Sequence, residues 1–220
     1  MGIGVVIYGP RYCGKTSFVG ASDALEVYAY PDVDWGVFKK LAFAVAAGDP
    51  VVVENVHFLT ESCTKYICDK ENEEHPQLAG NRKSIIYQKI KEEMRDVLFS
   101  LASKVNHIYF TADMDTKHLD SSLYKGTFMY PKFDWVLEDI MPHITQQTIC
   151  MTPTYKTVKR TSKLTGETEL IRKEKRIMIC SARPDIYAGD STEKLPNEFD
   201  AGTSGTEAYE NYMKYMKKEQ

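Results

Sequence analysis

Short apolar runs alternate with amphipathic stretches along the first 145 residues of the chain. Residues 3–8 are β-branched and aromatic, which predicts a buried strand. Comparable short runs occupy residues 25–30, 51–53 and 107–112. Between them, residues 35–47 and 84–105 carry apolar side chains at helical spacing. Strands that alternate with helices need crossover connections, so this pattern predicts a mostly parallel sheet.

The pattern changes in the second half of the chain. Residues 149–159 and 169–181 predict two strands around Lys163-Leu164-Thr165-Gly166, which is a hairpin turn signal. Residues 60–83 and 113–132 are polar and irregular, so we expect loops there. We therefore expect a three-layer α/β domain over residues 1–183 that ends in an antiparallel hairpin. The remainder, residues 184–220, predicts an acidic, solvated tail with a short terminal helix.

Composition narrows the class of protein. Of 220 residues, 43% are hydrophobic and 27% are charged, which is typical of a soluble domain. The sequence contains no apolar run of eighteen residues and no signal-peptide pattern at its N-terminus. We therefore expect a cytoplasmic protein without a membrane partner. The five cysteines lack a C-x-x-C pair, which favours reduced thiols. A net charge of −3 means that any surface for nucleic acid must be local.

One motif carries specific chemistry. The first strand runs into Gly9-Pro10-Arg11-Tyr12-Cys13-Gly14-Lys15-Thr16-Ser17, which has the G-x-x-x-x-G-K-T spacing of a phosphate-binding loop. Glycines allow backbone N–H groups to wrap phosphates, and a helix that follows adds partial positive charge. Lys15 is expected to reach the β- and γ-phosphates, while the Thr16 hydroxyl binds Mg²⁺. The sequence therefore predicts that ATP and Mg²⁺ bind at this loop.

Acidic residues at strand ends supply candidate partners for the metal. Glu54 ends the 51–53 strand and is expected to hold the water shell of Mg²⁺ together with Thr16. A surface glutamate with no such role is the alternative. Asp32 and Asp34 follow the second strand, and either carboxylate could polarise an attacking water. Asp34 could equally well cap the helix that begins at Trp35.

With these motifs, the chain resembles RecA-like P-loop ATPases. It resembles more narrowly the short phage-encoded nucleotide-binding proteins of AAA type, which are similar to phage single-strand annealing recombinases. The residues that carry the resemblance are the phosphate loop, segments 51–59 and 108–113, Lys175-Arg176-Ile177-Met178, and Arg183-Pro184. Glu54 departs from the usual aspartate.

The resemblance implies a DNA-stimulated ATPase that supports phage-type homologous recombination or repair. It implies a homo-oligomer, a ring or filament on single-stranded DNA, with nucleotide between subunits and a single-stranded-DNA-binding protein as a candidate partner. For a phage protein the location would be the host cytoplasm. A basic residue would reach the phosphates of the neighbouring subunit, and the candidates are Lys175, Arg176 and Arg183. Charges that protect a hairpin edge are the alternative.

Two segments are candidates for contact with DNA. Residues 156–176 hold eight basic and three acidic residues, a formal charge of +5. Residues 113–132 combine lysines with aromatic residues, which suits stacking on unpaired bases. The alternative for this second segment is a surface lid whose aromatic residues pack on the core. The candidate DNA contacts are Lys117, Lys125, Lys132, Lys156, Lys159 and Arg160.

Two other functions fit the same loop. A small-molecule or nucleotide kinase shares the loop and the length, and Arg160 with Arg172 could belong to its lid. A nucleotide-binding module that does not hydrolyse ATP also fits, since Glu54 is unusual and the residue that activates water is open.

Overall fold

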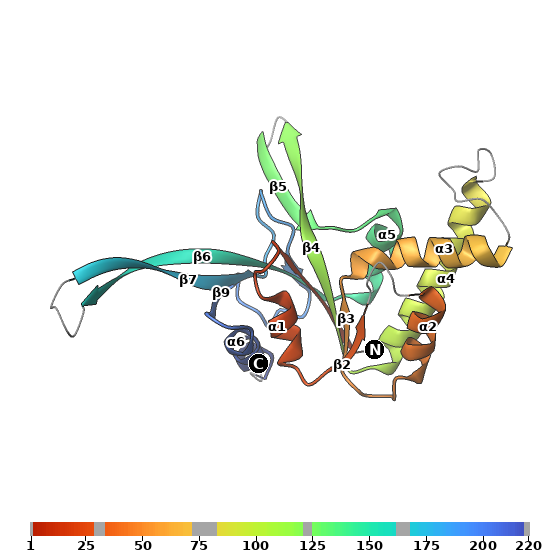
Figure 1. Cartoon of the computed structure of the whole chain (residues 1–220), viewed down its shortest axis with the longest axis horizontal. Coiled ribbons are helices and arrows are strands. Elements are labelled where there is room, and N and C mark those ends of the chain that lie inside the picture. Colours follow the sequence, from red (N-terminus) through yellow and green to blue (C-terminus); the bar gives the residue numbers. More distant parts are fainter. Residues whose placement is uncertain (1, 29–33, 72–82, 121–124, 162–167, 218–220) are drawn as a thin grey trace.

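A computed structural model describes residues 2–28, 34–71, 83–120, 125–161 and 168–217 of the chain. These residues form one nine-stranded sheet with the order β2-β3-β4-β1-β6-β7-β9, while β5 pairs with β4 and β8 with β6 (Figure 1). The strands are β1 (Ile3–Gly9), β2 (Leu25–Tyr28), β3 (Val51–Glu54), β4 (His107–Asp120), β5 (Lys125–Pro131), β6 (Gln147–Thr161), β7 (Thr168–Ile179), β8 (Gly189–Asp190) and β9 (Glu198–Gly202). The helices are α1 (Lys15–Gly20), α2 (Trp35–Ala44), η1 (Val56–Phe58), α3 (Leu59–Glu71), α4 (Lys83–Lys104), α5 (Trp135–Ile144) and α6 (Gly205–Met216).

The centre of the sheet is parallel. β1 pairs in parallel with both β4 and β6, and β3 pairs in parallel with β2 and β4. β7 and β9 then add antiparallel strands at one side. The expectation of a mixed α/β fold with a mostly parallel sheet is therefore confirmed. Within it, β4 separates the strand that leads into the phosphate loop from the strand that ends in Glu54.

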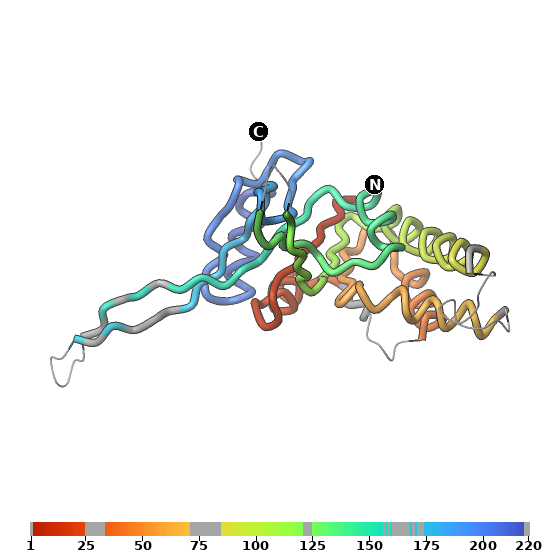
Figure 2. Tube along the Cα trace, turned by 90° about the horizontal axis from the view of Figure 1, so that it is seen from above, coloured from red at the N-terminus to blue at the C-terminus, as the bar shows by residue number. Residues whose placement is uncertain are grey.

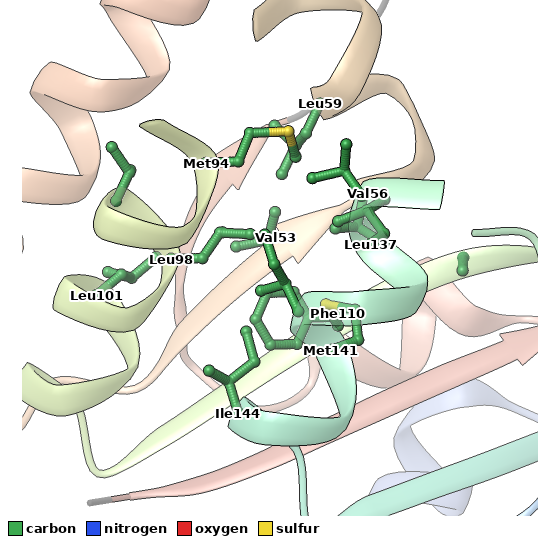
Figure 3. Packing of buried hydrophobic residues seen from close by; sticks show 14 of the residues in the cluster. Val53, Val56, Leu59, Met94, Leu98, Leu101, Phe110, Leu137, Met141 and Ile144 are labelled. Atoms are coloured by element: carbon green, nitrogen blue, oxygen red, sulfur yellow. The ribbon is translucent and has the colours of Figure 1, made fainter. Parts of the chain in front are cut away.

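Two hydrophobic clusters cover the two faces of the sheet. In β1, Val6 and Tyr8 pack into one cluster and Val5 and Ile7 into the other, because successive side chains of a strand point to opposite faces. The first cluster lies under α2, α3, α4 and α5, and Figure 3 shows residues of β3, β4, α4 and α5 that meet there. The second lies under α1 and α6. The phosphate loop thus connects a fully buried strand to a packed helix.

Two segments that the sequence predicts as loops are regular. Residues 60–71 continue the helix α3, while residues 72–82 lie outside the described residues. β4 continues to Asp120 and pairs with β5 from Met114↔Pro131 to Asp120↔Lys125. Both expectations of irregular structure were wrong for the described residues. For β4 and β5 the cause is strand pairing, which a polar composition does not reveal.

β6 and β7 form a long two-stranded arm. Their antiparallel pairing runs from Cys150↔Ile179 to Thr161↔Thr168, and the turn residues 162–167 lie outside the described part. Figures 1 and 2 both show the arm projecting away from the rest of the molecule. Its outer half therefore presents two strands without a packed layer.

The last described residues belong to the folded body. β9 pairs with β7, and α6 packs beside α1 (Figure 1). Tyr212 of α6 is fully buried and its hydroxyl donates to Gln147 Oε1 at 2.8 Å. The segment after residue 183, which composition predicts as a solvated tail, supplies apolar side chains to the second cluster. None of the helices within the described ranges is long and apolar enough to cross a membrane.

Candidate nucleotide site

The phosphate loop joins the end of β1 to the start of α1. Gly14 has a φ of 99°, in the left-handed region where glycine is favoured. A Cβ at this position would also lie 2.9 Å from Nε of Arg176. Since α1 has only six residues, its own partial charge is small, and the loop depends mainly on its N–H groups and side chains.

Lys15 is held at the base of the loop. The residue is 8% exposed, and its ammonium donates to the carbonyl oxygens of Gly9 at 2.9 Å and Pro10 at 3.0 Å. The same nitrogen lies 3.5 Å from Oδ1 of Asp113. The ammonium therefore lies between two carbonyl oxygens of the loop and the carboxylate of Asp113.

Asp113 is the carboxylate that faces the loop. Parallel register places Asp113 of β4 directly beside Gly9 of β1. Its Oδ2 lies 3.6 Å from Nε of Arg11 and 4.0 Å from Nε2 of His57. Sequence reasoning gave Asp113 no role, although an acid directly after the apolar run 107–112 was the available signal. Its position depends on strand register, which the sequence alone does not supply.

His57 is a second residue that the sequence did not single out. Its side chain is 6% exposed, and no described residue forms a hydrogen bond with Nδ1. Burial lowers the pKa of His57, and the nearby charge of Asp113 only partly opposes this. The imidazole is therefore neutral near pH 7, and it adds a polar group rather than a charge beside Asp113.

An open cleft of about 770 Å³ lies over the loop. Its charged lining consists of three cations and one carboxylate, a formal balance of +2, from Arg11, Lys15, Arg176 and Asp113. Thr16, Ser17 and Asn55 add polar groups. The volume falls within the range of about 300–1,000 Å³ that is common for small-molecule sites. Size and charge both suit a polyphosphate.

Arg176 reaches this cleft from β7 of the same chain. Its Nε donates to the carbonyl oxygen of Cys13 at 2.6 Å, and Nη1 donates to the carbonyl oxygen of Thr203. The other two finger candidates form ion pairs elsewhere, Lys175 with Asp200 and Arg183 with Glu198. The structure therefore separates Arg176 from the other two.

The acids that the sequence proposed lie in three different settings. Glu54 is 2% exposed at the end of β3, and the next residue, Asn55, lines the cleft. The Asn55 N–H donates to Oγ1 of Thr111 at 2.9 Å, which ties the ends of β3 and β4 together. Asp34 caps α2 and accepts from the N–H of Val37 at 3.2 Å. Asp32 lies outside the described residues.

The donor set fits the metal that the sequence predicts. Mg²⁺ prefers oxygen ligands and keeps several waters. The Thr16 hydroxyl and the Asp113 carboxylate line the cleft, with Glu54 at the neighbouring strand end. Within the described part of the chain, no cluster of three His, Cys, Asp or Glu side chains forms a separate metal site.

The candidate DNA contacts lie on two hairpins. Lys117 of β4 faces Phe128 and Tyr130 of β5, while Lys125 pairs with Asp120 at 2.9 Å. Lys132 follows β5, and its N–H donates to the carbonyl oxygen of Asp113 at 2.7 Å. The remaining three occupy β6 in the arm: Lys156, Lys159 and Arg160.

Comparison with known protein families decides the class. The model of a family described as an AAA domain matches residues 1–192. The chain belongs to this AAA domain family. Membership makes it a nucleotide-binding domain of the ATPase type, for which Mg²⁺ is the usual partner of the nucleotide. A search of curated proteins with the sequence of this chain finds no match.

Proposed function

We propose that this AAA domain binds and hydrolyses ATP with Mg²⁺. The observation that carries the proposal is the convergence of three cations on one cleft over the phosphate loop. Lys15, Arg11 and Arg176 would bind the triphosphate, and Lys15 would give up its contact with Asp113 to a phosphate oxygen. Thr16 and the strand-end acids Asp113 and Glu54 would hold the metal, which neutralises charge on the phosphates.

We propose further that the domain is a RecA-like ATPase that acts on single-stranded DNA in phage-type recombination or repair. The sheet order supports this, since the five parallel strands run β2-β3-β4-β1-β6, with β4 in the middle between β1 and β3. Two hairpins extend from that core and would bind the strand: β4–β5, which combines lysines with aromatic residues, and the basic β6–β7 (Figure 1). Oligomerisation as a ring or filament, with Lys175 or Arg183 at the interface, belongs to the same proposal.

The first test is ATP turnover by the full chain with and without single-stranded DNA. We expect DNA to increase turnover, and we expect Lys15→Ala to reduce turnover to background because the triphosphate loses its main buried cation. Lys65→Ala, which changes an exposed lysine of α3, is the control and should behave as the wild type. Absence of both DNA binding at low salt and DNA stimulation would reject the DNA part of the proposal.

A non-hydrolysing nucleotide-binding module is the second candidate. The observation in its favour is that Asp34, one of the two residues proposed to activate water, caps α2 instead of lining the cleft. Tight ATP binding without turnover, even in the presence of single-stranded DNA, would favour this module over the ATPase.

A further inference from the structure

A second cavity lies between the β4–β5 hairpin and α5. Its volume is about 270 Å³, slightly below the range of about 300–1,000 Å³ for typical small-molecule sites. A volume of this size suits one ring system. None of the residues that line the nucleotide cleft lines this cavity.

Aromatic side chains dominate the walls of this ring-sized cavity. Phe128 and Tyr130 lie nearly parallel on β5, with ring centroids 6.3 Å apart and an angle of 20° between the ring planes. Phe133 and the half-exposed Tyr187 contribute further rings. Such walls stack on flat heterocycles, and every nucleobase offers a flat face of this kind.

The polar groups at the cavity favour binding of a nucleobase over binding of an aliphatic side chain. The Lys117 ammonium lies 5.5 Å from the ring of Phe128 and 5.4 Å from the ring of Tyr130, so one cation stands over the aromatic wall. Glu138 also lines the cavity, and its carboxylate accepts but does not donate when ionised. A base with an exocyclic amino group can donate to it, whereas a phosphate would be repelled.

We propose that this cavity holds one unpaired nucleobase of a single-stranded nucleic acid. The base would stack on the aromatic wall, while its phosphate would remain outside, within reach of Lys117. The assignment of the base to a DNA strand rests on the proposed function, whereas the base-binding cavity rests on its own lining residues. Glu138 predicts a preference for adenine, cytosine or guanine, which all present an exocyclic amino group, over thymine.

The cavity is connected to the phosphate loop by a short path of hydrogen bonds. Tyr8, the residue directly before the loop, is fully buried and donates its hydroxyl to the carbonyl oxygen of Tyr187 at 2.6 Å. The backbone of Tyr187 in turn donates to the carbonyl oxygen of Met129 on β5 at 2.9 Å. A ligand against Tyr187 therefore lies two contacts away from Gly9.

The test uses oligothymidylate that contains one 2-aminopurine, whose fluorescence falls when it stacks on an aromatic ring. We expect quenching on addition of the full chain, and Tyr187→Ala should remove most of it and weaken binding about tenfold, the scale of one lost stack. The Tyr187 side chain is 47% exposed, and its two backbone hydrogen bonds do not need the ring. Phe43→Ala on α2, at 46% exposed, is the matched control and should leave quenching unchanged.

Anisotropy of an end-labelled oligonucleotide, recorded in parallel, separates the possible failures. Binding without quenching, or quenching that survives Tyr187→Ala, would overturn the base cavity while the DNA proposal stands. No binding at low salt would reject the proposed DNA binding, and with it a DNA strand as the source of the base in the cavity. The free riboside of 2-aminopurine is the last comparison. If it binds as tightly as the oligonucleotide, the base in the cavity does not come from a strand, and the cavity binds a mononucleoside instead.

Discussion

Asp113 shows what single residues add to a phosphate loop. It brings one negative charge to within 4.0 Å of Arg11, Lys15 and His57, so the cations of the loop are held in place before a triphosphate arrives. Side chains that are positioned in advance lose less entropy when they bind. The sequence predicted Lys15 and Thr16 because their spacing is local. It did not predict Asp113, because that position follows from the pairing of two strands a hundred residues apart.

Arg176 is the residue that can show whether the nucleotide site is completed by its own chain or by a neighbouring subunit. We expect Arg176→Ala to weaken ATP binding about tenfold or more, because a hydrogen bond to a charged group contributes about 1.5–3 kcal/mol. Titration with a fluorescent ATP analogue measures the change. Lys175→Ala alters the adjacent residue, which pairs with Asp200 and does not line the cleft, so it should leave ATP affinity unchanged.

A mixing experiment then tests in which chain Arg176 acts. Arg176→Ala protein keeps Lys15, and Lys15→Ala protein keeps Arg176. If Arg176 served the site of its own chain, a mixture of the two would stay as inactive as either alone. Recovery of ATP turnover in the mixture would mean that Arg176 completes a neighbouring subunit's site.

At the scale of elements, the contact between α6 and α1 links the end of the chain to the phosphate loop. Gly205 opens α6 so close to α1 that an added Cβ would lie 2.3 Å from both the carbonyl carbon and Cβ of Ser17. We expect Gly205→Ala to destabilise the fold by about 1–3 kcal/mol, the usual cost of overpacking, although alanine favours helix formation. Because Ser17 lines the nucleotide cleft, ATP affinity should fall too.

Urea unfolding and nucleotide titration measure the two effects of Gly205→Ala. Gly20→Ala is the matched control, because Gly20 ends α1 and a Cβ there would meet no atom within 4 Å. It should leave stability unchanged or raise it by up to about 1 kcal/mol. Equal stability of the two variants would show that α6 is not held tightly against α1.

Element prediction succeeded where the spacing of apolar residues is clear, and it failed at α3 and at the outer half of β4. The strand 3–8 and the helix 84–105 were visible in the spacing of apolar residues, and both occur within one residue of the expected bounds. The helix α3 was missed because its charged residues hide a regular buried face, formed by Leu59, Cys63 and Ile67 at intervals of four. The outer half of β4 was missed because five of its seven residues, 114–120, are exposed, so no apolar run marks it.

At the scale of the molecule, the arm formed by β6 and β7 is both the part that projects from the body and a part rich in positive charge. The segment 156–176 carries a formal charge of +5 in a chain of net charge −3. Lys175 and Arg176 at its end contact the body, while residues 156–161 and 168–174 of the arm, with five basic and two acidic residues, extend away from it (Figure 2). A basic extension of this kind attracts a phosphate backbone at a distance and releases counterions when it binds.

The arm predicts a specific change in salt dependence. We expect the triple variant Lys156→Gln, Lys159→Gln and Arg160→Gln to bind single-stranded DNA more weakly at low salt. The slope of log affinity against log salt should become less steep by about two, since each phosphate contact on a single strand contributes about 0.7. Anisotropy titrations over a range of salt concentrations measure it.

The matched control removes the same charge from the other side of the sheet. The control is the triple variant Lys40→Gln, Lys65→Gln and Lys70→Gln. These three lysines lie on α2 and α3, and all are exposed. An equal loss of slope in both triples would mean that DNA responds to net charge and not to the arm.

The continuity of β4 has a mechanical consequence. One unbroken strand carries Asp113 at the nucleotide cleft and Lys117 at the aromatic cavity. Four residues of a strand span about 13 Å at about 3.3 Å per residue. A tilt of about 5° at one end of such a lever moves the other end by about 1 Å, a displacement that is able to change a reaction rate about a hundredfold. Because both side chains lie on this strand, we expect a ligand that tilts β4 at one site to displace a side chain at the other.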